Sequence, residues 1–219
     1  MASRPGSPAT PPYPRRHKGT LLIVGSAPNL MDDLAAASHY RPSAHVMAIN
    51  EAAGVVKAHF IASQHPDVML RFAGLQEAKF GRHGFTTHSG FDTHGQDPRQ
   101  YPAVNYWWPR IQCGATSAWA GVRIARMMGF DEVILCGCPM NGGDGYFMPT
   151  LAGSTAQPRF GFLGPEKSLV KSFKENLAAY ARSEGDGVYS MSGYTGEVLG
   201  LPPDIRRDFE HGRERHRHM

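Results

Sequence analysis

The feature that most constrains the fold is a run of four aliphatic residues, Leu21 to Val24, that ends abruptly at Gly25. An apolar run of this length without polar alternation is typical of a strand buried on both faces, as in a parallel sheet covered by helices. The Ala-rich segment 30–38 follows at once and has the length of a short helix. This strand, turn and helix together predict an α/β fold.

Short apolar runs and helix-like segments continue to alternate along the chain. We expect further strands at 44–49, 58–63, 131–136 and 188–191, a helix or turn at 52–56, and helices at 116–128 and 165–183. Gly129 follows the helix at 116–128, where a left-handed cap is expected. This order predicts a Rossmann-like fold, a mostly parallel sheet with helices on both faces, in which ligands bind outside the carboxyl ends of the strands.

We expect one nucleotide-binding domain over residues 19–203, flanked by two polar ends. Residues 1–18 hold five prolines among small and basic residues, a composition that predicts a disordered arm. Residues 204–219 are equally polar and predict a charged tail. The segment 74–112, rich in glycine, histidine and aromatic residues, predicts a long loop or lid inserted into the domain.

Composition argues against several classes of protein. No apolar run approaches the roughly 20 residues that span a bilayer, and Pro and Ser stand where a signal peptide needs an apolar stretch. We therefore expect a cytoplasmic protein without a membrane span. Much of the net charge of +4 lies in the two ends, which lack interleaved aromatic residues, so nucleic-acid binding is not expected.

Metal binding is not expected either. His83, His88 and His94 are spaced by five and six residues, but no cysteine or acidic residue stands beside them at metal-site spacing. The three cysteines, Cys113, Cys136 and Cys138, are interpreted as reduced thiols.

The turn after the first strand, Gly25 to Asn29, has the chemistry of an anion site. Gly25 permits close approach to the backbone, Ser26 offers a hydroxyl, and Pro28 leads into a helix whose free amides favour a phosphate. The later glycines of the dinucleotide fingerprint and the ending of a P-loop are absent. We expect this turn to hold the phosphate of a nucleotide or nucleotide-sugar, while an ordinary strand-to-helix turn is the alternative.

A second helix start lies at Thr116 and Ser117, where either hydroxyl can cap the helix and leave amides exposed. Capping alone is the alternative interpretation. The aromatic run Tyr106 to Trp108 offers flat rings that suit a sugar or a base, or that pack the middle segment onto the domain.

Five segments together resemble one group of Rossmann-like proteins. They are Ile23 to Leu30, Ala48 to Glu51, Gly114 to Ser117, Ala125 to Gly137 and Val188 to Gly193. The group contains the bacterial CMP-sialic acid sialyltransferases and the DUF115 proteins related to the archaeal 6-hydroxymethylpterin diphosphokinase. Short phage-encoded DUF115 proteins are similar in length and in their ending. The resemblance covers about residues 20–66 and 112–203 and leaves out the middle segment.

The resemblance implies a nucleotide- or nucleotide-sugar-dependent transferase of glycosyltransferase type. Its co-substrate would be a CMP-type nucleotide, its acceptor is not specified, and no tightly bound cofactor is implied. The positions that match nucleotide-holding residues of the sialyltransferases are Gly25, Ser26, Asn29, Asn50, Gln64, Thr116 and Ser117. Tyr146 matches a tyrosine that binds the departing phosphate.

Two departures from the group bear on catalysis. Gly-Cys-Pro at 137–139 stands where Gly-x-Asp is implied, and no histidine lies near 164–166, where the sialyltransferases have their general base. The candidate replacements are His65, Asp144 and Glu166. Two alternatives stay open: a pterin-type diphosphokinase that needs Mg²⁺ and a carboxylate such as Asp144, and a non-catalytic nucleotide-binding phage accessory protein.

Overall fold

The computed structural model describes residues 13, 16–90, 100–108, 111, 116–140 and 167–208, and the side chains of all of these except 167–173. Within this part of the chain, seven strands form one sheet in the order β5-β4-β3-β2-β1-β6-β7, and every pairing is parallel. The strands β1 to β7 are Thr20–Val24, His45–Ile49, Phe60–Ser63, Thr86–Gly90, Tyr106–Trp108, Glu132–Cys136 and Val188–Ser190. The predicted α/β, Rossmann-like class is confirmed.

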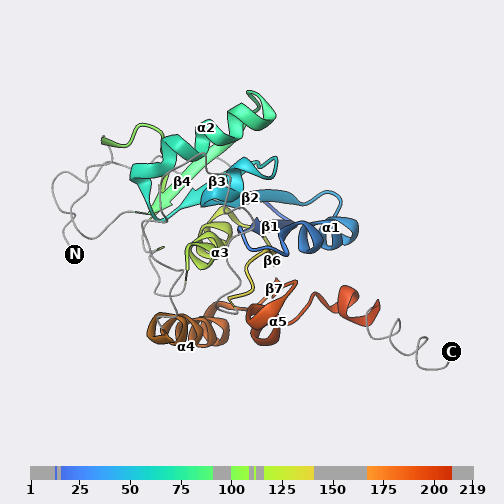
Figure 1. Ribbon diagram of the computed structural model, residues 1–219. Coiled ribbons are helices and arrows are strands. Elements are labelled where there is room, and N and C mark those ends of the chain that lie inside the picture. Colours follow the sequence, from blue (N-terminus) through green and yellow to red (C-terminus); the bar gives the residue numbers. More distant parts are fainter. Residues whose placement is uncertain are drawn as a thin grey trace.

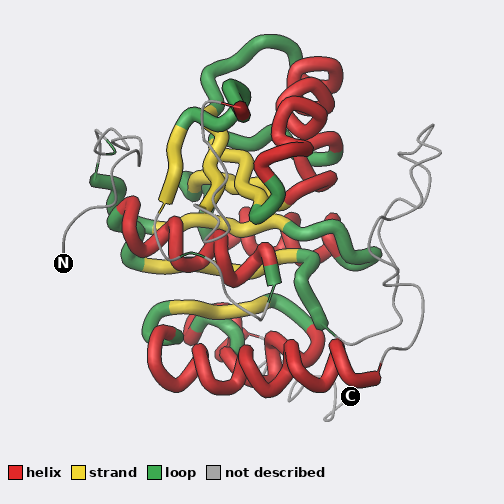
Figure 2. The backbone as a smooth tube through the Cα atoms, turned by 90° about the vertical axis from the view of Figure 1, so that its left-hand side faces the viewer, coloured by secondary structure: helices red, strands yellow, loops and turns green. Residues whose placement is uncertain are grey.

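Helices cover both faces of this sheet (Figures 1 and 2). The α-helices α1 to α5 are Leu30–Tyr40, Met69–Phe80, Ser117–Met128, Lys167–Glu184 and Gly193–Leu199. Two 3₁₀ turns, η1 at Asn50–Gly54 and η2 at Pro66–Val68, follow β2 and β3. No helix in the described residues combines the length and the apolar character needed to cross a membrane.

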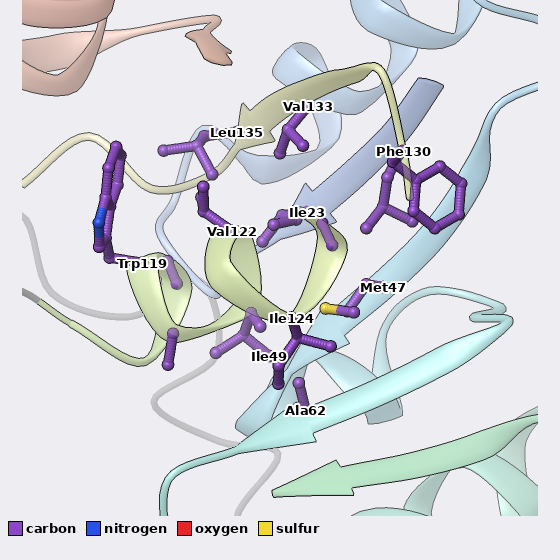
Figure 3. Close-up of a cluster of buried hydrophobic side chains, with 14 of the residues drawn as sticks. Ile23, Met47, Ile49, Ala62, Trp119, Val122, Ile124, Phe130, Val133 and Leu135 are labelled. Atoms are coloured by element: carbon purple, nitrogen blue, oxygen red, sulfur yellow. The ribbon is translucent and has the colours of Figure 1, made fainter. Parts of the chain in front are cut away.

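The two faces of β1 belong to two separate cores. Leu21 and Ile23 pack with residues of α3, whereas Leu22 and Val24 pack with α1, η1 and α2. Successive side chains of a strand point to opposite faces, so an uninterrupted aliphatic run is what a strand covered on both sides requires. Figure 3 shows the α3 side, where Ile23, Met47 and Leu135 meet Val122 and Ile124.

The order of the strands reverses between β1 and β6. The chain adds β2 to β5 on one side of β1, and α3 then leads back to place β6 and β7 on the other side. Gln64, after β3, reaches the carbonyl of Thr116 at the start of α3, while Met128 at its end accepts a hydrogen bond from the His17 amide before β1. α3 therefore begins beside the carboxyl ends of the strands. Gly129 ends it in the predicted left-handed conformation, with φ of 96°.

The predicted loop or lid over 74–112 is wrong for three elements. α2 continues to Phe80, and β4 and β5 extend the sheet. β4 reads Thr-Thr-His-Ser-Gly and has no apolar run. It can nevertheless be buried, because its polar groups are hydrogen-bonded inside the protein. Polar strands of this kind give no periodic apolar signal.

Both predicted polar ends are ordered where they meet the domain. His17 stacks on Phe130 with ring centroids 4.7 Å apart and its amide donates to the Met128 carbonyl, so this residue packs on the domain although it falls within the predicted disordered arm. At the other end, Ile205 is fully buried and Asp204 pairs with Arg41, which corrects the predicted start of the tail at 204. Residues 1–12 and 209–219 lie outside the described residues.

A group of rings in mutual contact, which we call the aromatic band, involves the first residues of β2, β3 and β5 and continues along β4 and β5. It consists of Tyr13, His17, His45, Phe60, His88, Tyr106, Trp108 and Phe130. Trp108 and Trp107 are both buried, on opposite faces of β5. Of the two roles predicted for the aromatic run, packing is therefore the one observed for these two tryptophans.

Candidate functional site

The reversal of strand order brings the turns after β1 and β6 into direct contact. The amide of Gly25 donates to the carbonyl of Cys136 at 2.9 Å, and the amide of Ala27 donates to the carbonyl of Gly137 at 3.1 Å. A Cβ on Gly25 would lie 2.5 Å from the Gly137 oxygen and 2.6 Å from the Cys138 sulfur. Gly25 is thus required because two backbones meet there.

This contact uses part of the predicted phosphate cradle, whose role in binding a phosphate stays a prediction. Two of its amides, those of Gly25 and Ala27, already have protein acceptors, and the Leu30 amide donates to the Ala27 carbonyl. The Gly25 turn therefore packs against the turn after β6 at the switch point, the place where the order of the strands reverses. Ser26 remains: it is partly exposed, and its hydroxyl has no hydrogen-bond partner in the described part of the chain.

Asn29 belongs to an internal network centred on Asp33. One Asp33 carboxylate oxygen accepts from the Asn29 amide at 3.1 Å, from the Ser192 hydroxyl at 2.6 Å and from the Gly137 amide at 2.9 Å. The network ties α1 to the ends of β6 and β7. Asn29 is therefore placed near the site but occupied within the protein.

Asp33 was missed by sequence reasoning because acidic residues in the first turn of a helix are ordinary. Its side chain is buried, and this burial raises the pKa of the carboxyl above its usual range. The hydrogen bonds from Ser192, Gly137 and Asn29 favour the ionised form and act in the opposite direction. The position four residues after Asn29, which places both on one helix face, is the signal that could have indicated it.

Asn50 lies where β2 ends and η1 begins, with a φ of 53°. Positive φ is uncommon outside glycine, although asparagine tolerates it better than most residues. Its Oδ1 atom is buried and has no hydrogen-bond partner in the described residues. A residue at positive φ with a buried, unpaired acceptor is unusual in a protein interior, which makes Asn50 a candidate for a functional position.

The start of α3 is the second part of the site. Thr116 caps the helix, its hydroxyl accepting from the Trp119 amide at 3.2 Å. Gln64 donates a long hydrogen bond of 3.5 Å to the Thr116 carbonyl. The structure therefore brings two predicted site residues from distant segments together, with Ser117, partly exposed, as the first residue of the helix.

Trp119 is the functional candidate that sequence reasoning missed. It is 1% exposed, yet its indole Nε1 has no hydrogen-bond partner in the described residues. The position of Trp119 in the apolar pattern of α3 indicates a core residue, and its side chain does lie in the core. Burial of a donor without an acceptor is visible only in three dimensions.

The candidate catalytic residues are only partly placed. His65 follows β3 beside Gln64, is partly exposed, and donates its amide to the Ser63 hydroxyl at 3.0 Å. Asp144, Tyr146 and Glu166 lie outside the described residues, as do Cys113 and His94. Among the described residues, His65 is thus the candidate base at this edge.

The histidines of the middle segment have structural partners. His88 is fully buried, accepts from the Trp108 indole at 2.9 Å and contacts the Thr86 hydroxyl at 2.8 Å. Both ring nitrogens of His83 contact backbone carbonyls, those of Gly81 and Ala58. No cluster of three or more His, Cys, Asp or Glu side chains suited to a metal ion occurs in the described ranges.

Cys136 and Cys138 are free thiols next to the switch point. Burial raises the pKa of both, that of Cys138 to about 12, so neither is a reactive thiolate at neutral pH.

We call the residues Ser26, Asn50, Gln64, Thr116, Ser117 and Trp119, which follow the strands or begin α3, the carboxyl edge. Two of its polar atoms, an acceptor on Asn50 and a donor on Trp119, are buried and have no hydrogen-bond partner within the described ranges. Comparison of the chain with protein families, with curated proteins and with solved structures found no match. The described residues therefore establish a Rossmann-like sheet with polar residues at its carboxyl edge.

Proposed function

We propose that the protein binds a nucleotide or nucleotide-sugar at the carboxyl edge and uses it as the donor in a group-transfer reaction. The observation that carries the proposal is Asn50, a residue at positive φ whose buried Oδ1 lacks a donor in the described residues. An amino group of a base or a hydroxyl of a sugar would supply that donor. Ligands of parallel α/β sheets bind at this edge.

The phosphate of this ligand would lie at the start of α3, and not on the Gly25 turn. The first amides of a helix have no intrahelical acceptor, and the helix dipole favours negative charge there. Ser117 and Thr116 stand at this point, with Gln64 beside them. In the reaction these groups would stabilise the charge of the departing phosphate, while His65 or one of the undescribed candidates, Asp144 and Glu166, would deprotonate the acceptor.

The class of reaction comes from the resemblance to the sialyltransferases and DUF115 proteins. The Mg²⁺-dependent diphosphokinase alternative depends on Asp144, which lies outside the described residues. The non-catalytic alternative keeps the same binding edge and needs no base. Asp33, a buried carboxyl at this end of the sheet, accepts from three protein donors through one oxygen, so that oxygen is engaged within the protein.

A thermal-shift panel of CMP, CDP, UDP, GDP and ATP, each with and without Mg²⁺, tests binding to the full chain. A ligand at about 100 times its Kd stabilises the folded state by about 2.7 kcal/mol. We expect stabilisation by at least one nucleotide and its loss in Asn50→Ala. Asn105→Ala is the matched control, because Asn105 bonds to Thr87 far from the edge and its loss should leave the nucleotide response intact.

Product analysis separates the chemical alternatives. Release of CMP from a CMP-sugar without metal supports the transferase, and consumption of ATP only with Mg²⁺ supports the diphosphokinase. Binding with neither reaction supports the non-catalytic protein. No stabilisation by any nucleotide would contradict the proposed site.

A further inference from the structure

The indole nitrogen of Trp119 is a buried donor for which the described part of the chain supplies no acceptor. Trp119 is 1% exposed, and no described residue accepts from its Nε1. Trp108, which is also buried, donates its Nε1 to His88 at 2.9 Å. Because leaving a buried donor unpaired opposes folding, the unpaired indole calls for an acceptor that the described residues do not supply.

The Trp119 ring is held in place and is not free to turn toward a partner. It stacks on Tyr180 of α4, with ring centroids 6.1 Å apart and planes at 20°. Arg123 lies over the other ring of this pair, 4.6 Å from the Tyr180 centroid, and binds Glu184 through two hydrogen bonds of 2.9 Å. The direction of the N–H is therefore fixed before any ligand arrives, which reduces the entropic cost of binding.

The donor lies at the end of α3 that borders the carboxyl edge. Trp119 is in the first turn, and Figure 3 shows its nitrogen on the side of the ring that faces away from Val122 and Leu135. The amides of Ser117 and Ala118 lie in the same turn, and like all first amides of a helix they have no carbonyl acceptor within the helix. Indole donor, helix amides and helix dipole all favour an anionic oxygen at this point.

We propose that Trp119 is a specificity-determining residue whose Nε1–H donates to a phosphate oxygen of the bound nucleotide. This inference rests on the proposed function, which places a nucleotide at the same edge. It adds that the protein distinguishes a nucleotide from its nucleoside through the indole donor. The step is a hydrogen bond, and no covalent chemistry is assigned to the ring.

The test compares CMP with cytidine on the full chain. In Trp119→Phe, which keeps an aromatic ring and removes the N–H, the Kd for CMP should rise about tenfold while the Kd for cytidine changes less than twofold. In the wild-type protein, the indole N–H signals of its three tryptophans can be followed by NMR with ¹⁵N labelling. The Trp119 signal should move with CMP and stay in place with cytidine, which tests the contact even if the variant folds poorly.

Trp108→Phe is the matched control, since its indole already donates to His88 and CMP affinity should change less than twofold. Equal CMP affinity in wild type and Trp119→Phe would overturn this inference and leave the proposed function standing. An equal loss of affinity for CMP and for cytidine would also overturn it, because the indole would then contact the nucleoside part of the ligand. If the wild-type chain binds neither, the same comparison is made with the nucleotide of the panel that stabilises it and with the matching nucleoside, and a chain that binds no nucleotide of the panel would contradict the proposed function itself.

Discussion

The carboxyl edge and the aromatic band belong to the same sheet and carry buried polar side chains of similar types. In the aromatic band, the imidazole of His88 is bonded to Trp108 and Thr86. At the carboxyl edge, Asn50 and Trp119 each bury a polar atom without a partner in the described residues. The paired imidazole stabilises one region, whereas the other keeps hydrogen-bonding capacity that a ligand can use.

The largest effect should come from removing a paired donor. Trp108→Phe deletes the donor of a fully buried imidazole and leaves a cavity, and we expect it to lower the free energy of unfolding by about 3 kcal/mol. Trp119→Phe makes the same change in ring size but removes a donor that has no described partner. It should therefore cost about 1 to 2 kcal/mol less, measured by urea unfolding without ligand. Equal losses would contradict the contrast between the regions.

The pH dependence of stability sharpens the contrast through His88. Burial, aided by nearby His17, lowers the pKa of His88 to about 3, whereas an unfolded histidine titrates near 6.5. Between these values the unfolded chain binds one more proton, so stability is lost as the pH falls below about 6.5. The loss is about 1.4 kcal/mol per pH unit once the unfolded histidine is protonated. In His88→Gln the free energy of unfolding should depend less steeply on pH between pH 6 and 5, by the equivalent of one bound proton. An unchanged slope would contradict this prediction.

A smaller effect is expected for the ion-pair network at the end of α1. Arg41 binds Glu132 at 2.6 Å and Asp204 at 2.7 Å, which lowers the pKa of both carboxyls, that of Asp204 to about 2. Arg41→Ala should cost about 1 to 2 kcal/mol at pH 7. The difference should shrink in acid, because ionised carboxyls supply this stability above their unfolded pKa near 4.

Arg71→Ala serves as the control for this prediction. Its pair with Glu51 is more exposed and longer, at 3.8 Å, so its loss should change stability by less than about 0.5 kcal/mol. A cost for Arg71→Ala as large as that for Arg41→Ala, in the same chemical denaturation series, would show that the network geometry contributes nothing.

The smallest effect on stability is expected at Asn50. Asn50→Gly removes the steric cost of the positive φ and also removes the unpaired oxygen. Glycine at the same time increases the conformational entropy of the unfolded chain. These terms oppose each other, so thermal unfolding without ligand should change by less than about 0.5 kcal/mol. Nucleotide stabilisation should nevertheless disappear. A large loss of stability would indicate that Asn50 is a structural residue.

Local patterns predicted much of the fold and a part of the site. The aliphatic run before Gly25 and the apolar spacing of 116–128 correctly predicted β1 and α3, including the Gly129 cap. β4 was not predictable in this way, because its buried polar residues depend on partners such as Asn105 and Trp108 that come later in the chain. Strand propensity depends on neighbours in the sequence, whereas hydrogen-bond pairing of buried polar groups depends on neighbours in space.

By itself, the sequence determined the α/β class, the parallel sheet and the edge at which polar residues gather. It did so because burial on both faces demands continuous apolar strands, and these are visible as local runs. Only the tertiary structure decided which polar groups at that edge are already used. Gly25 contacts Gly137, and Asn29 is bonded to Asp33, whereas Asn50 and Trp119 each bury a polar atom that no described residue pairs. Hydrogen-bond satisfaction depends on segments that are distant in sequence, so no local pattern encodes it.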